Sequence, residues 1–468
     1  MRFSAAAAAE RLLPGRLAVR ARPWADRLDA IIFAPDARGA AGRMSLIAFA
    51  LRVVNAVIAF VSQVLLARYM GGFEYGIFVL VWVTMIILGN TACLGFQTSV
   101  IRFVPEYEAK KSPGELRGVL VASWRVVLAA STIIALAGAL GIWVFEESIQ
   151  SYYVLPFYLG LVCLPMIAVG DLLQGTARAY AWPLWSMIPS FLIRPLLILL
   201  FLWGLHVGGI SPNATAAVLA AILATYLTTI LQIAYVAVKT ENPLRSVKPV
   251  FRLRSWLMVS VPIFLSNGFY YLLTNADVLL VGHFMQPTDV AVYFATTKAL
   301  ALVHFVYYAV RTGAIQRYSA FLHSGDMAGL ARFARETAYW TFIPATVMGF
   351  IVLLLGKPIL MLFGPGFAAG YPLLFPLVAA VILRATVGPA ESLLTMSGHE
   401  RSSVAIYGFT LAANIALSFL LIPSLGLWGV AIATSVSLVL EATLLAFTVW
   451  RKLGILMVAL LPAPKETR

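Results

Sequence analysis

Basic side chains inside long apolar stretches are the residues of this sequence best suited to do chemistry. Arg52, Lys298 and Arg311 lie within such stretches, and Arg102 lies near the end of another. A charge inside a bilayer is costly, so each is a candidate functional residue. A guanidinium group binds a phosphate through two parallel hydrogen bonds, so the expected chemistry is anion binding. For Arg102 and Arg311 a second interpretation stays open, because arginines near helix ends also extend to the membrane surface.

Polar neighbours at helical spacing accompany these cations. Asn55 follows Arg52 by one helical turn, so both share one face of small or polar residues. A second face, with Lys298 beside it, carries four polar residues: Thr297, His304, Tyr308 and Arg311. These two helical faces carry the candidate binding residues: Arg52, Asn55, Lys298, His304, Tyr308 and Arg311.

The elements that must position these residues are membrane-spanning helices. The chain has 468 residues, of which 61% are hydrophobic and 12% charged, whereas soluble domains carry about 25% charged residues. About 20 apolar residues cross a bilayer as a helix. The apolar runs are continuous, unlike the alternating segments of a barrel, and predict an all-α polytopic membrane protein of about twelve helices: 45–68, 74–100, 118–144, 152–178, 182–205, 214–239, 255–282, 288–314, 337–362, 371–396, 402–423 and 427–450.

The distribution of Lys and Arg predicts the orientation of these helices. Basic residues gather in the connectors after the second, fourth, sixth, eighth and tenth helices and at both termini. By the positive-inside rule, both termini are expected in the cytoplasm. Arg68 and Lys357 are the exceptions. The net charge of +14 therefore reports topology, and nucleic acid is not an expected partner.

The N-terminal extension, residues 1–43, differs from the rest. It holds eight arginines and lacks the compact apolar core of a signal peptide. Two interpretations stay open: a basic cytoplasmic tail that lies on anionic lipid, or a natural start at Met44, where the membrane pattern begins.

An internal repeat divides the membrane region into two halves. Gln63–Phe78 resembles Asp277–Phe294, Val100–Phe103 resembles Ile315–Tyr318, and Gly170–Arg178 resembles Ala390–Gly398, in the same order and at nearly constant offset. Six spans per copy make a parallel repeat. The expected domains are an N-lobe at 44–240, a basic cytoplasmic linker at 241–254, a C-lobe at 255–452 and a cytoplasmic tail at 453–468.

Three segments carry a resemblance to a known family: "LLARYMGGFEYGIF", "GFQTSVIRFVPEY" and "EAKKSPGELRG". They resemble the polysaccharide-biosynthesis flippases (Wzx-like) of the multidrug/oligosaccharidyl-lipid/polysaccharide exporter superfamily. The matching positions include Leu66, Arg68, Tyr75 and Gly76, then Gly95 and Arg102 after them. The resemblance covers about residues 44–452, leaves out the extension at 1–43, and says little about the substrate.

The resemblance implies two six-helix lobes in a V that open alternately to each side of the bacterial inner membrane. The implied activity moves an undecaprenyl-diphosphate-linked oligosaccharide, such as an O-antigen, exopolysaccharide or capsule repeat unit, between leaflets. Helices 1, 2, 7 and 8 line the cavity in that family, so Arg52, Lys298, Arg311 and Arg102 are the expected cationic lining. The implied partners are the lipid-linked glycan, membrane lipids and other polysaccharide-assembly proteins, and no oligomeric state is implied.

Acidic residues within the spans raise a separate question, because a buried carboxylate must pair, bind a cation or take a proton. Asp171 and Glu391 are equivalent in the repeat, which favours structural pairing with Arg194 or Arg384. Some relatives bind a coupling cation in the second lobe. A site of this kind is expected to use three oxygen-bearing residues for Na⁺, with H⁺ as the other coupling ion: Asp277, Asn414 and Glu441.

Other classes of function have less support. The sequence lacks a phosphate-binding loop and the spacing of a zinc site, so no resident cofactor is expected. Cys93 and Cys163 lie in apolar runs and favour packing over a disulfide. A multidrug extruder of the same superfamily is the main alternative, although Arg and Lys at the candidate positions favour anionic cargo. An integral membrane glycan-assembly enzyme is a weaker one.

The segment Gln63–Phe78 is expected to connect the first two helices on the periplasmic side. Gly71 and Gly72 permit a tight connection. Arg68 is expected to extend outward or to pair with Glu74. The segment identifies the family resemblance but is not expected to bind cargo.

Overall fold

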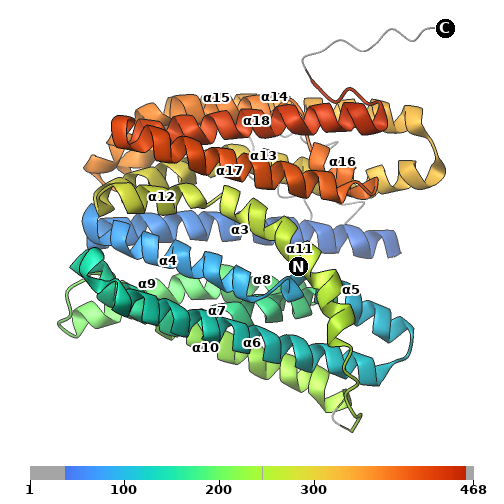
Figure 1. The fold of residues 1–468 in the computed structure, drawn as a ribbon, viewed down its shortest axis with the longest axis horizontal. Coiled ribbons are helices and arrows are strands. Elements are labelled where there is room, and N and C mark those ends of the chain that lie inside the picture. Colours follow the sequence, from blue (N-terminus) through green and yellow to red (C-terminus); the bar gives the residue numbers. More distant parts are fainter. Residues whose placement is uncertain (1–36, 245, 460–468) are drawn as a thin grey trace, which may run out of the picture. The chain divides into compact units, whose positions relative to one another are not determined.

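The computed structural model describes residues 37–244 and 246–459, and this part of the chain is nearly all helical (Figure 1). The chain divides into two compact units, residues 1–60 and 61–468. Helix α3 (Ala37–Met70) begins in the first unit, and its last turns belong to the second. Residues 1–36, which make up most of the N-terminal extension at 1–43, lie outside the described residues, and so does the prediction of a basic tail on anionic lipid for them.

Twelve helical segments in the described part of the chain are long and apolar enough to cross a membrane, which confirms the predicted number. They are formed by α3, α4 (Gly72–Ala92) with α5 (Phe96–Ala109), α6 (Pro113–Val144), α7 (Ser151–Ala179), α8 (Pro183–Ile188) with η2 (Pro189–Ile193) and α9 (Arg194–Val207), α10 (Ala214–Leu244), α11 (Leu253–Leu273), α13 (Pro287–Ser324), α14 (Met327–Met361), η3 (Pro365–Leu373) with α15 (Leu374–Ala385) and α16 (Ala390–Met396), α17 (Glu400–Leu425) and α18 (Leu427–Leu453).

Several spans that the sequence predicts as single helices are interrupted. The second breaks at Gly95, which has a left-handed φ of +83° and a backbone so close to Ser260 that a Cβ would overlap its carbonyl oxygen. The seventh ends at Leu273 and is followed by the short α12 (Ala276–Phe284). The tenth breaks between Ala385 and Ala390. Apolarity defines a span, but these breaks depend on local backbone conformation, which hydropathy does not contain.

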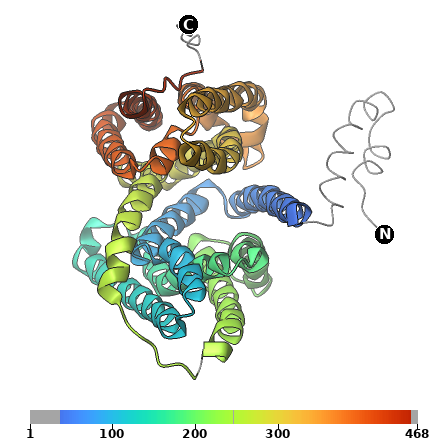
Figure 2. The ribbon, with the colours of Figure 1, turned by 90° about the vertical axis from the view of Figure 1, so that its right-hand side faces the viewer.

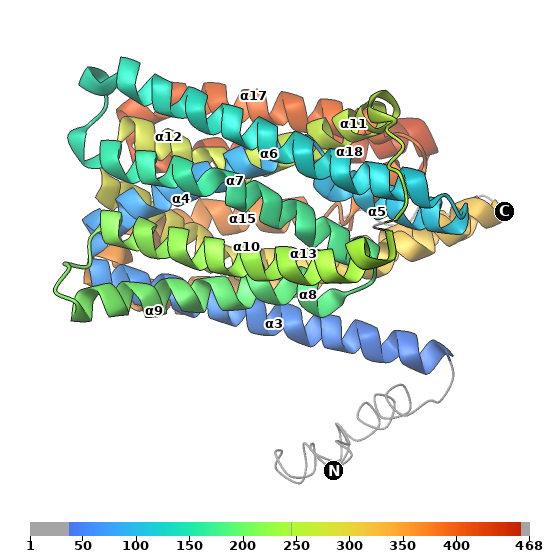
Figure 3. The same ribbon diagram turned by 90° about the horizontal axis from the view of Figure 1, so that it is seen from below.

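Within the second unit the helices pack as two groups. Helices α4 to α10 pack mainly on one another around α7, and α13 to α18 pack mainly on one another around α14 and α18. Figure 1 shows the second group above the first, and Figure 3 shows the long helices of the first group side by side. Helix α4 joins the groups, because it packs along α13 and also contacts α12.

Helix α11 contacts both groups, as the yellow-green helix in Figure 2 shows. Near its start, Nε1 of Trp256 donates a hydrogen bond to the hydroxyl of Tyr107 at 2.8 Å. Near its end, the ring of Tyr270 packs on Tyr407 of α17, with centroids 5.5 Å apart. The preceding connector is held to the first group, since the Val250 amide donates to the Gly114 carbonyl at 2.9 Å.

The connection after α3 corrects one expectation. Arg68 does not pair with Glu74: its Nε and Nη2 atoms donate to the carbonyls of Leu362 and Met361 at 2.6 and 2.8 Å. Glu74 instead accepts a hydrogen bond from the Ala214 amide at 2.7 Å, at the start of α10. Both contacts lie at helix ends, where backbone groups lack partners within the helix, although the Met361 carbonyl also accepts from the Gly364 amide at 3.2 Å. Sequence separation hid them, because the partners lie 294 and 140 residues away.

Candidate functional site

Helix α13 positions four of the expected binding residues. Its start is fixed by Pro287 and by a capping box, in which the Gln286 side chain accepts from the Asp289 amide and the Asp289 carboxylate accepts from the Gln286 amide. The helix then runs without interruption to Ser324 and carries the four residues in this order: Lys298, His304, Tyr308 and Arg311. Because the helix is continuous, the first and the last of these residues are held several turns apart.

Lys298 and Arg311 therefore belong to two different surroundings. They are 13 positions apart on one helix, which is about 20 Å along the axis and roughly 140° around it. The two phosphates of a diphosphate span only a few ångströms, so one diphosphate cannot contact both side chains at once. The two residues therefore lie at different depths along one helix, and their place in one cationic lining stays a prediction.

Lys298 is half-buried over an aromatic ring. Its Nζ lies 4.4 Å from the ring centroid of Phe294, at the distance of a cation–π interaction. One turn earlier, the hydroxyl of Tyr293 donates to Oδ2 of Asp277 at 2.7 Å. Asp277 also interacts electrostatically with Lys298. This part of α13 thus combines one cation with one buried carboxylate from α12.

Arg311 lies where α13 faces α11 and α16. Its Nε is 3.6 Å from Oε1 of Glu391, and 35% of its side chain remains exposed. One turn away, the hydroxyls of Tyr308 and Tyr270 share a hydrogen bond of 2.7 Å. Arg311 is thus held by a carboxylate while part of its side chain stays accessible, an arrangement that permits anion binding.

A buried ion cluster lies behind Arg311. Arg384 donates from Nη2 to Oε2 of Glu391 at 3.1 Å and from Nε to Oε1 of Glu441 at 2.8 Å. Its Nη1 donates to the Gly388 carbonyl at 3.1 Å, in the break between α15 and α16. The Tyr307 hydroxyl donates to Glu391. Two arginines balance two carboxylates, so the cluster is neutral in formal charge, as burial requires.

The cluster confirms one expected pair and changes the role of another residue. Glu391 pairs with Arg384, as the repeat suggested. Glu441, expected beside Asp277 and Asn414 in a cation site, has Arg384 as its ionic partner. Sequence analysis did not find the link between Glu441 and Arg384, or the contribution of Tyr307. The available signal was Arg384 itself, a charge inside an apolar run.

The other two residues of the expected cation site are Asn414 and Asp277. Among the described residues, Oδ1 of Asn414 and Oγ of Ser418 have no hydrogen-bond partner, although both side chains are at least 98% buried. They lie one turn apart on α17. Asp277 keeps its bond to Tyr293 on α13. No cluster of three or more His, Cys, Asp or Glu side chains suited to a metal occurs among the described residues.

Arg102 lies apart from the other candidates. Its side chain is 68% exposed and 3.9 Å from Glu106, one turn later on α5. The same carboxylate accepts a hydrogen bond of 2.6 Å from Lys110, at the end of the helix, which raises the pKa of Lys110. This geometry is that of an exposed helix end, the second of the two interpretations of Arg102.

His304 and the residues of the first span complete the expected set. His304 is half-buried on α13, one turn before Tyr308. Arg52 and Asn55 lie on α3 within the first unit, so the structure gives their place along that helix and not their relation to the cations of the second unit. The side chain of Arg52 lies outside the described side chains.

The first group contains a buried counterpart of the cluster. Arg194 is 8% exposed, and its Nε has no hydrogen-bond partner among the described residues. It follows the π-helical turn η2, and its Nη2 lies against Gly170 of α7. The neighbouring Asp171 interacts with it electrostatically. The expected relation of Asp171 to Arg194 is thus electrostatic in this structure.

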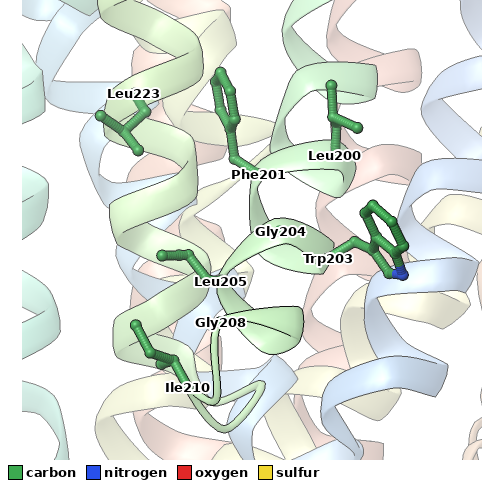
Figure 4. A pocket seen from close by; sticks show the side chains of 8 residues that line it. All are labelled: Leu200, Phe201, Trp203, Gly204, Leu205, Gly208, Ile210 and Leu223. Atoms are coloured by element: carbon green, nitrogen blue, oxygen red, sulfur yellow. The ribbon is translucent and has the colours of Figure 1, made fainter.

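An apolar cavity of about 430 Å³ lies between the end of α9 and the first turns of α10 (Figure 4). Its lining contains only apolar side chains and glycines: Leu200, Phe201, Trp203, Gly204, Leu205, Gly208, Ile210 and Leu223. None of these side chains can neutralise an anionic head group, so this cavity is not a candidate site for a diphosphate.

Comparisons with known proteins place the chain in a family. The model of the family described as polysaccharide biosynthesis protein matches residues 42–315, and the model described as MatE matches residues 262–420. No curated protein sequence matches the chain. The first match covers more than half of the chain and includes α4, α11 and most of α13.

Solved structures share the fold at low sequence identity. An inward-facing multidrug resistance MATE family transporter of the MOP superfamily has a TM-score of 0.70 at 15% identity, covering 86% of this chain and 94% of that one. The lipid II flippase MurJ, in an inward closed conformation, gives 0.67 at 14%, covering 86% and 87%. A MOP superfamily transporter from Pyrococcus furiosus, described as having a binding pocket of reverse polarity, gives 0.57 at 15%, covering 91% and 96%.

These identities show the fold alone, whereas the family match extends over most of the sequence that carries the candidate residues. The multi-pass helical architecture, the motifs around Arg68 and Arg102 and the family match agree with one another. The chain belongs to the polysaccharide biosynthesis protein family.

Proposed function

We propose that this protein is a flippase that moves an undecaprenyl-diphosphate-linked oligosaccharide across the bacterial inner membrane by alternating access, and that it is not an enzyme. The observation that carries the proposal is the family match over residues 42–315. The likeness to the lipid II flippase MurJ supports the same class of cargo. The repeat unit of an O-antigen, exopolysaccharide or capsule fits this proposal equally well.

The cations of α13 supply the chemistry that such a cargo needs. A diphosphate must leave water to cross about 30 Å of hydrocarbon, and a cation in the path compensates the lost hydration. Arg311, partly exposed, and Lys298, half-buried, occur at two depths of one span. We assign Arg311, Lys298 and Arg52 to the diphosphate, with Arg311 and Lys298 contacting it in turn as it moves along the span. The other candidates are assigned to the rest of the head group: Asn55, His304, Tyr308 and the weaker candidate Arg102.

Both termini are proposed to lie in the cytoplasm, with two lobes of six spans, residues 44–240 and 255–452, rocking about the cargo. Coupling to Na⁺ or H⁺ is assigned to the second lobe, where Asp277 has a buried carboxylate and the buried Oδ1 of Asn414 has no hydrogen-bond partner in the described part of the chain. Membrane lipids and other polysaccharide-assembly proteins are the proposed partners.

The test uses a strain that makes a surface glycan and lacks its own flippase. Expression of this chain should restore the glycan, whereas Arg52→Ala with Lys298→Ala should abolish it and cause lipid-linked precursor to accumulate. Arg451→Ala is the matched control, because Arg451 is an exposed arginine in the last turn of α18. Normal glycan export by the double variant would contradict the proposal.

A second candidate function is multidrug extrusion, which the MatE match over residues 262–420 favours. It predicts that removal of Lys298 lowers drug tolerance while glycan export stays normal. Cationic drugs need acidic surroundings, whereas the partly exposed candidate Arg311 is itself a cation. For this reason the anionic cargo is the first proposal.

A glycan-assembly enzyme would instead release product in detergent without any bilayer.

A further inference from the structure

The connector between α3 and α4, which the proposed cargo site does not use, fastens the first helix group to the second. Arg68, in the last turn of α3, donates to the carbonyls of Leu362 and Met361 at 2.6 and 2.8 Å. These carbonyls lie at the end of α14, which carries partial negative charge. The Met361 carbonyl also accepts a hydrogen bond from the Gly364 amide at 3.2 Å. One guanidinium therefore caps a helix of the other group.

Close backbone contact follows one to two turns later. A Cβ on Gly76 would overlap the carbonyl oxygen of Pro287, the first residue of α13, so only glycine allows α4 and α13 to approach as they do. A Cβ on Gly72 would lie 3.6 Å from Cγ2 of Thr288. The starts of the two helices are thus in direct contact.

Aromatic packing closes the same end. Tyr75 is fully buried, and its ring lies 6.4 Å from that of Phe294 on α13 and 6.2 Å from that of Phe367 in η3. Its hydroxyl donates to Oε1 of Gln63 on α3 at 2.8 Å. Further along α4, Leu80 packs on Gly282 of α12 and is 7% exposed. Polar capping thus lies outside, and a dry aromatic layer lies beneath it.

We propose that these contacts form a releasable clamp, here called the Arg68 clamp: Arg68, Gly72, Tyr75 and Gly76 against Pro287, Phe294, Met361, Leu362 and Phe367. It holds closed the end of the second unit at which α4 and α13 begin. Cargo release at that end requires the clamp to open, a requirement that rests on the proposed transport function.

The physical character of the clamp suits a reversible contact. Arg68, Met361 and Leu362 are exposed, so water replaces the two hydrogen bonds when they break. The contact with Pro287 is made by a glycine that leaves no side chain to withdraw. The clamp also explains why a segment with an arginine and three glycines interrupts an apolar region: those residue types allow two helix starts to touch and separate.

A cross-link tests whether the clamp must open. Gly72→Cys with Thr288→Cys, in a chain with Cys93→Ala and Cys163→Ala, places two thiols across the contact. Oxidation should stop transport of the lipid-linked glycan in proteoliposomes, and reductant should restore it in the same sample, which controls for folding. Transport at an unchanged rate by the oxidised protein would overturn the proposal.

A second measurement needs no cargo. The reporter Leu80→Cys, in the same background, is labelled with a membrane-impermeant maleimide from each side. Arg68→Gln should raise the labelling rate about fivefold from one side only, since two hydrogen bonds to one charged group are lost. Gly76→Ala should raise it further by forcing α4 from α13. Arg451→Gln and Gly141→Ala are the controls, because a Cβ on Gly141 meets no atom within 4 Å.

The two measurements separate this inference from the proposed function. Increased labelling in Arg68→Gln and Gly76→Ala without glycan transport would support the clamp and contradict the flippase. Labelling equal to that of the two controls would overturn the clamp even if the protein proves to transport glycan.

Discussion

Arg384 donates a hydrogen bond from Nε to Oε1 of Glu441 at 2.8 Å, and both side chains are at least nine-tenths buried. The same guanidinium reaches Glu391 on α16 and the Gly388 carbonyl in the helix break. One buried cation thus ties α15, α16 and α18 together. This relationship makes the second helix group sensitive to single charge changes.

Replacing Arg384 with Gln should destabilise the protein severely. Two buried carboxylates would lose their main cation, and breaking a buried pair costs about 3–5 kcal/mol. The measurement is the midpoint of thermal unfolding in detergent. Glu441→Gln in the Arg384→Gln background should recover part of the loss because it removes one uncompensated charge. An unfolding midpoint for Arg384→Gln within one degree of the unmodified protein would show that the cluster is not structural.

Lys298 and Arg311 should contribute separately to glycan export when each is replaced by Gln. Because about 20 Å of helix separates them, each substitution should remove a separate contact with the diphosphate. Charged hydrogen bonds contribute about 1.5–3 kcal/mol, so we expect at least tenfold slower glycan export in each variant and a larger loss in the double variant. Flipping of a labelled lipid-linked oligosaccharide in proteoliposomes measures both rates. A double variant no slower than either single one would indicate one shared site.

The coupling ion is tested by Asn414→Ala, matched by Thr443→Ala on an exposed face of α18. Since Oδ1 of Asn414 is buried without a partner among the described residues, its removal should leave stability nearly unchanged. It should abolish the dependence of transport on an imposed Na⁺ gradient if Na⁺ is the coupling ion. Transport by the variant that still follows the Na⁺ gradient would exclude Asn414 from the ion site.

Gly95→Ala should destabilise the first helix group. At φ +83° an alanine is strained, and its Cβ would overlap the Ser260 carbonyl. We expect a loss of about 1–3 kcal/mol, and Gly204→Ala provides the control because a Cβ there meets no atom within 4 Å. Thermal unfolding in detergent reports both. Equal midpoints would mean that α5 and α11 shift apart without cost.

The sequence contained the information for the helical class and for the number of spans. Each depends on apolar runs, and runs from Leu46 to Trp450 are long enough to cross a bilayer whatever their neighbours. The Glu391–Arg384 pair was also predictable, since a buried carboxylate needs a nearby cation and seven residues place them close together. Charge and hydropathy are properties of short segments, so the sequence of each segment is sufficient to determine them.

Tertiary structure alone decided which charges remain available for cargo. Glu441 was expected in a cation site, and its carboxylate instead accepts a hydrogen bond from Arg384, 57 residues away. Arg68 was expected to extend outward or to pair with Glu74, and it donates instead to the carbonyl of Leu362 at the end of α14, 294 residues away. Lys298 and Arg311 were both expected in the cationic lining, and the continuity of α13 places them several turns apart along it. The sequence determined by itself that these side chains lie in or beside membrane spans; their partners follow from how the helices break, turn and pack, because long-range contacts depend on the arrangement of the whole chain.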